Sequence, residues 1–164
     1  MQHYLYISFI LFLVSIRCPA QLEGSISKYQ EQPNLPRVFM IGEYEKPYEN
    51  LTAGYDKLLL NIYKDDIDKA FSAWTSVLIS MEDYAKEVSF NLNGLKLWMN
   101  VFFNMDGSIQ HIVYYPKPNS RNMEFEHLTN FFISFCKVYH FKDPIPVKCS
   151  HFGSASFPTF AKRD

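Results

Sequence analysis

The sequence lacks the spacings by which catalytic and metal sites are usually found. No two of its five histidines lie four residues apart, as a pair of ligands on one helix would. Cys149 and His151 are two residues apart and would share one face of a strand, but no third ligand accompanies them. Ser154 and Ser156 are not framed by a Gly-x-Ser-x-Gly elbow. We therefore predict no enzyme activity, no metal and no bound cofactor.

An excess of charge of one sign is also missing. The chain carries 16 basic and 17 acidic residues, a formal net charge of −1, and this balance excludes the electrostatic footprint of a nucleic-acid-binding protein. Cysteine is scarce, with three in 164 residues. Cys136 and Cys149 would form a disulfide in an oxidising compartment if their Cα atoms came within about 7 Å. The alternative is a pair of buried thiols.

Only one long apolar run is present, from Ile7 to Ile16, and it is too short to cross a bilayer as a helix. Its length is typical of the hydrophobic region of a signal peptide. Cys18 and Ala20 would place small side chains three and one residues before a cleavage site at Gln21. Residues 1–20 are therefore predicted to be a cleavable signal peptide, which favours a periplasmic or secreted protein without stable membrane insertion after cleavage.

The remaining chain is long enough to form one domain with a core of its own. Residues 21–50 are polar and interrupted by Pro33, Pro36 and Pro47, so we expect an irregular lead-in with a short strand at Val38 to Ile41. Residues 51–160 are predicted to form a single domain, and residues 161–164 a frayed C-terminus.

Two segments of the predicted domain have the apolar spacing of amphipathic helices. The first follows an expected N-cap at Asp65, and the second ends near His140, before Pro144. A shorter helix is expected from Tyr55 to Tyr63. The apolar positions are Ile67, Ala70, Phe71, Trp74, Val77, Leu78, Met81 and Tyr84 in the first helix, and Leu128, Phe131, Phe132, Phe135 and Val138 in the second.

Between these helices the pattern changes to alternation, which is typical of half-buried strands. The alternating residues are Leu95, Leu97, Met99, Val101 and Phe103 in one run, and Ile109, His111, Val113 and Tyr115 in the next. Asp106-Gly107 joins the runs as a tight turn, and Val147 to Phe157 would add a third strand. The predicted fold class is α+β, a small antiparallel sheet packed on two helices in the order α-β-β-α-β.

This order of elements resembles the C-terminal domain of TonB, the energy-transducing protein of Gram-negative envelopes. The residues that carry the resemblance are Trp98, Val101, Phe103, Asp106-Gly107-Ser108-Ile109 and Val113. It implies binding of a short extended peptide by strand addition at the edge formed by Val147 to Phe157. The chain departs from the family in lacking a retained anchor and a long Pro-rich, Lys-rich span, so energy transduction is not implied. A signal ending in Ala20-Gln21 also resembles those of exported Bacteroidetes proteins.

The sequence thus predicts an exported, non-catalytic protein-binding or adaptor module of the cell envelope. Its partner would be a protein or peptide of the envelope, and not a nucleic acid. The candidate binding residues are Trp98, Phe102, Tyr114, Cys149, His151 and Phe152. Two alternatives remain open. One is a structural envelope protein that forms a homodimer, and the other is a small hydrolase in which a pocket brings His111 or His151 to a nucleophile.

Overall fold

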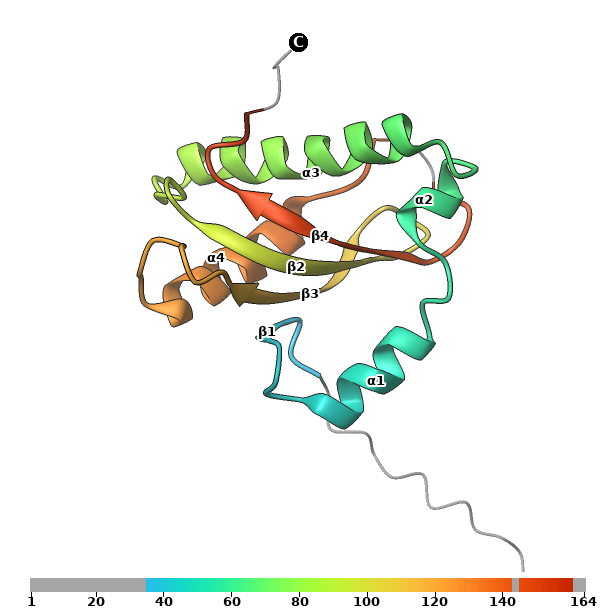
Figure 1. Ribbon diagram of the computed structural model, residues 1–164, viewed down its shortest axis with the longest axis horizontal. Helices are drawn as coiled ribbons and strands as arrows, with labels where there is room; N and C mark the ends of the chain where they lie inside the picture. Colours follow the sequence, from blue (N-terminus) through green and yellow to red (C-terminus); the bar gives the residue numbers. More distant parts are fainter. Residues whose placement is uncertain (1–34, 143–144, 161–164) are drawn as a thin grey trace, which may run out of the picture. The chain divides into compact units, whose positions relative to one another are not determined.

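The computed structural model describes residues 35–142 and 145–160 (Figure 1). The expected signal peptide at residues 1–20, the lead-in up to residue 34 and the expected frayed end at 161–164 lie outside the described residues. The elements are, in chain order, β1 (Val38–Met40), α1 (Glu45–Ala53), α2 (Leu59–Ile62), α3 (Ile67–Glu87), β2 (Lys96–Phe103), β3 (Ile109–Pro116), α4 (Phe125–Val138) and β4 (Cys149–Ser156). None of the described helices is long and apolar enough to span a membrane.

The fold is α+β, which confirms the predicted fold class, but the sheet is mixed rather than antiparallel. Its strand order is β1-β3-β2-β4. The hairpin β2-β3 and the pairing of β4 with β2 are antiparallel, as expected from the turn at Asp106-Gly107. The addition is β1, which pairs parallel with β3 because Val38 and Phe39 bury their side chains there. The final strand β4 therefore forms one edge of the sheet.

The described part of the expected lead-in, residues 35–50, contains the expected short strand, which is β1, and also most of α1, which was not expected. The ordered elements therefore begin before residue 51. Pro47 suggested a break in the helical pattern, but it lies in the first turn of α1. A proline is tolerated at that position because the backbone N–H groups of the first turn have no partner within the helix.

The helices α3 and α4 cover one face of the sheet and enclose the main core. Trp74 and Met81 from α3 and Phe132 from α4 belong to the same buried cluster as Leu97 and Met99 from β2. The N-cap of α3 is Asp66, whose side chain accepts a hydrogen bond from the backbone N–H of Lys69 at 3.1 Å, rather than the expected Asp65.

Three of the predicted apolar positions on the helices are exposed instead of buried. Ile67 and Phe71 lie at the N-terminal end of α3, and Val138 ends α4. The helical period places these side chains near the core stripe, but periodicity alone does not determine which end of the stripe is covered.

A bulge in the hairpin corrects the predicted division of β3 into two faces. Phe102 pairs with His111 and Phe103 with Ile109, so Gln110 is an extra residue in β3. An extra residue shifts the alternation by one position. Ile109 therefore faces the helices, whereas His111 and Val113, predicted on the same face as Ile109, lie on the opposite face.

Candidate functional site

The sheet face opposite α3 and α4 is divided into a covered part and an open part. The segment around α1 covers Phe39, Phe102 and Val113. Beyond it lies what we call the open aromatic face, made by Trp98, Tyr115 and Phe152. Trp98 is 43% exposed, Tyr115 50% and Phe152 57%. Trp98 is the register partner of Tyr115, and Phe152 follows one strand over on β4, so the three rings share one face.

The rings of the open aromatic face are held in an ordered arrangement. Trp98 and Phe152 stack with a 6.0 Å separation of ring centroids and an angle of 10° between their planes. Lys117 places its Nζ 4.0 Å from the centroid of the Trp98 ring. The same Nζ donates a hydrogen bond to Ser154 Oγ on β4. A cation over an indole face is a stabilising contact, and here it fixes a positive charge beside the stacked pair.

Phe102 is not part of this open surface, in contrast to the expectation for a binding residue. It is fully buried and meets Tyr55 edge-on, with ring centroids 5.0 Å apart. Its neighbour Asn100 is buried as well, and its Nδ2 donates to the Tyr48 hydroxyl at 3.1 Å. The Asn100 Oδ1 has no hydrogen-bond partner among the described residues. A buried polar atom without a hydrogen-bond partner lowers the stability of the fold. The remaining hydrogen bond of Asn100 depends on α1, because α1 carries Tyr48.

Tyr114, also expected to bind, lies in the core against α4. Its hydroxyl is 2.7 Å from Thr129 Oγ1 and donates to the Phe125 carbonyl at 3.2 Å. Burial raises the pKa of this phenol above its ordinary value. Because of the bulge at Gln110, Tyr114 points toward the helices. Its hydroxyl therefore contacts α4, and Tyr114 does not lie on a binding surface.

Cys149 and His151 share the helix-covered face of β4, so neither lies on the open aromatic face. Cys149 is fully buried, and burial raises the pKa of its thiol to about 12. The His151 ring packs on Trp74 at 4.5 Å between centroids, and desolvation lowers its pKa to about 4. A Cβ on Gly153 would lie 2.7 Å from His151 Nε2, so this packing requires a glycine there.

Cys136 and Cys149 are both free and buried, so the thiol alternative describes them and the disulfide does not. Burial raises the pKa of the Cys136 thiol to about 12 as well, which makes it a poor nucleophile. No group of three His, Cys, Asp or Glu side chains suited to a metal ion is found within residues 35–142 and 145–160.

The outer edge of β4 is the second component of the candidate site. Ser150 donates its backbone N–H outward, to the carbonyl of Lys57 at 2.9 Å, and Leu58 bridges to Ser150 in parallel fashion. Because backbone groups alternate along a strand, the N–H and C=O groups of Phe152, Ser154 and Ser156 also point away from β2.

One bond already reaches this edge from the helix layer. Trp74 Nε1 donates to the Ser154 carbonyl at 3.3 Å. Across the described residues, the backbone N–H and C=O of Phe152 show no hydrogen bond beyond the sheet. Apart from the Ser154 carbonyl, the outward backbone groups from Phe152 to Ser156 are therefore unused donors and acceptors at a sheet edge.

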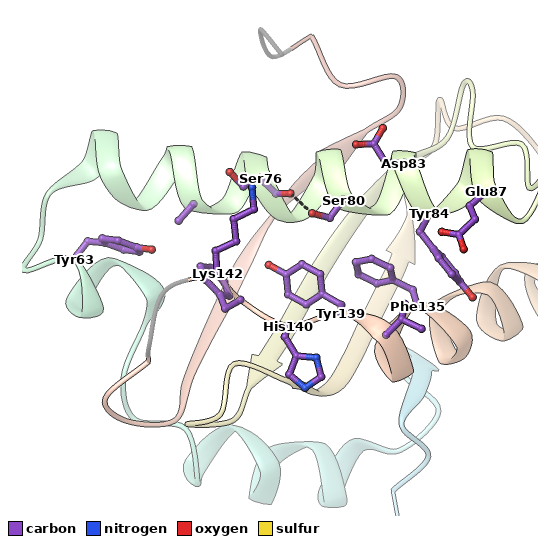
Figure 2. A pocket seen from close by; sticks show the side chains of 13 residues that line it. Tyr63, Ser76, Ser80, Asp83, Tyr84, Glu87, Phe135, Tyr139, His140 and Lys142 are labelled. Carbon is purple, nitrogen blue, oxygen red and sulfur yellow. Dashed lines mark hydrogen bonds between the residues drawn. The ribbon is translucent and has the colours of Figure 1, made fainter. Parts of the chain in front are cut away.

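A groove of about 510 Å³ lies on the other side of the molecule, between α3 and the chain that follows α4 (Figure 2). Figure 2 shows Tyr139 and Phe135 on one wall, and Ser76 and Ser80 on α3 as the other. Burial raises the pKa of the Tyr139 phenol. Neither His111 nor His151 lines this groove, so it does not provide the pocket that the hydrolase alternative requires.

Comparisons with known proteins add no family to this description. A scan against protein-family models found no match, and searches of curated proteins and of solved structures found none either.

The candidate binding residues predicted from the sequence include Trp98 and Phe152 but not Tyr115 and Lys117, which lie beside them. The signal was present in the strand register, since a residue at the end of β3 must face the start of β2 in a hairpin.

Proposed function

We propose that this protein is an exported, non-catalytic binding module that takes up an extended peptide by strand addition along the outer edge of β4. The observation that carries the proposal is the unpaired backbone of Phe152 at the sheet edge. The resemblance to TonB C-terminal domains supports the same mode, since their final strand is the one that receives a peptide. Main-chain hydrogen bonds would supply affinity, and the neighbouring side chains would supply specificity.

The existing contact at Ser150 supports the proposed line of an added strand. Residues Lys57 and Leu58 already occupy the first position along this edge in strand-like pairing. A peptide would continue the same line past Phe152 toward Ser156. The exposed Phe152 ring, stacked on Trp98, would offer an apolar contact at the centre of that line.

The test is selection of binders from a display library of random peptides, followed by amide hydrogen exchange with a selected peptide. We expect slower exchange at the amides of Phe152, Ser154 and Ser156. In Phe152→Pro the central N–H is lost, and affinity should fall at least about tenfold. The matched variant Phe152→Thr keeps this N–H and should lose less. Binding that leaves these amides unprotected, or that is equal in both variants, would contradict strand addition.

A second candidate function is self-association through the same edge, because an exposed edge strand can pair with its own copy. Two β4 strands related by a two-fold axis would pair in antiparallel fashion and cover both Phe152 rings. Sedimentation equilibrium distinguishes the candidates. A dimer that becomes monomeric in Phe152→Pro would favour self-association over peptide uptake.

A further inference from the structure

Resting on the proposed function, we infer which peptide this edge would select. The ligand is an extended segment with an aromatic residue opposite Phe152 and an acidic residue two positions away, opposite Ser154. The inference depends on side-chain alternation, the position of two lysines, and the rings that lie on the opposite face.

The aromatic preference follows from the register of an added strand. A residue paired with Phe152 would project on the same side of the sheet, with its Cβ about 4.5 to 5.5 Å from that of Phe152. Trp98 and Phe152 already stack on this side. A third ring would extend the row across β2, β4 and the peptide, and would cover the exposed edge of Phe152.

The acidic preference follows from the charges at one end of the open aromatic face. The residue opposite Ser154 would project toward Ser154 Oγ, to which Lys117 Nζ donates. Lys96 lies two residues before Trp98 on β2, so its side chain is on the same face, and it pairs with Ser156. Among the described residues, neither lysine forms an ion pair. A carboxylate at this position would meet two positive charges without displacing an existing acidic partner.

The intervening peptide residues would project toward α3, on the helix-covered side of the sheet. They would meet the Trp74 indole and the His151 imidazole, which is neutral there because of its low pKa. Phe71 lies one helical turn before Trp74 and is 66% exposed. Small β-branched residues suit these positions, because they favour extended backbone and pack on apolar surfaces.

The test uses synthetic peptides that begin opposite Phe152 and extend toward Ser156, one for each strand direction, because Leu58 already pairs with Ser150. The probes are acetyl-Tyr-Thr-Asp-Thr-amide for a parallel strand and acetyl-Thr-Asp-Thr-Tyr-amide for an antiparallel one, each compared with one peptide in which Lys replaces Asp and another in which Ala replaces Tyr. With the purified protein, we expect the Asp peptide to bind roughly tenfold more tightly than the Lys peptide at low salt. Lys117→Glu should reverse this order. Lys137→Glu makes the same change of charge on α4, behind the other face of the sheet, and should not.

The outcomes separate this inference from the proposal beneath it. Equal binding of the Asp and Lys peptides, abolished by Phe152→Pro, would overturn the acidic preference and leave strand addition standing. Equal binding of the Tyr and Ala peptides would overturn the aromatic preference in the same way. No binding of any peptide at millimolar concentration, or a dimer that depends on Phe152, would overturn both.

Discussion

At the scale of single residues, Trp74 joins three parts of the molecule. It lies in the main core, packs on His151 and donates to the backbone of β4. We expect Trp74→Ala to lower the free energy of unfolding by roughly 3 to 5 kcal/mol, because it opens a cavity beneath β4. Denaturant titration measures the loss. A loss below about 1 kcal/mol would contradict the placement of this face of α3.

His151 gives the protein a predicted dependence on pH. Its folded-state pKa of about 4 lies below the ordinary 6.5, so the unfolded chain binds more protons between these values. This contribution to stability is complete above pH 6.5 and is lost as the pH falls toward 4. The lowered pKa of His111 acts in the same direction.

The test is His151→Gln, which cannot be protonated in this range. Urea midpoints of both proteins should be compared at about pH 7.5 and about pH 4.5. The wild type should lose more stability than the variant. An equal loss in the two proteins would show that His151 is not desolvated in the folded state.

At the scale of elements, α1 is attached to the sheet by a polar contact inside an aromatic cluster. Tyr48 accepts a hydrogen bond from Asn100 Nδ2 and packs edge-on against Phe39 and Phe102. Tyr48→Phe keeps the ring but leaves the whole Asn100 amide without a partner. We expect a loss of about 1 to 3 kcal/mol in thermal or urea unfolding. Restored stability in the double variant with Asn100→Val would confirm the cause.

The elements that the sequence predicted are those whose residue pattern depends only on nearby positions in the chain. The periodicity of α3 and α4 and the turn at Asp106-Gly107 each depend on near neighbours in the chain. A short strand at the position of β1 was expected, but its pairing with β3 was not, because the two strands lie far apart along the chain, and helix α1 was missed. The bulge at Gln110 has no signature in the sequence, since any residue can be the extra one.

At the scale of the whole molecule, the candidate site could be predicted only in part. Trp98 and Phe152 lie on the exposed surface, as expected. Phe102, Tyr114, Cys149 and His151 are packed by α1, α3 or α4, and strand alternation alone does not show which helix covers which half of a face. The remoteness of α1 from β2 in the sequence explains why Phe102 was mistaken for a surface residue.

The bridge between Leu58 and Ser150 would affect the register in which a peptide pairs with β4. An open edge of uniform backbone allows a strand to slide by two residues at a time, since each position offers the same hydrogen bonds. Here the outer edge of β4 is closed at one end, because Leu58 already pairs with Ser150. A peptide that pairs with β4 from the Ser156 end could therefore extend only until it met Leu58. The register of a bound peptide would thus be fixed from this end, and only its first few residues would contribute to recognition.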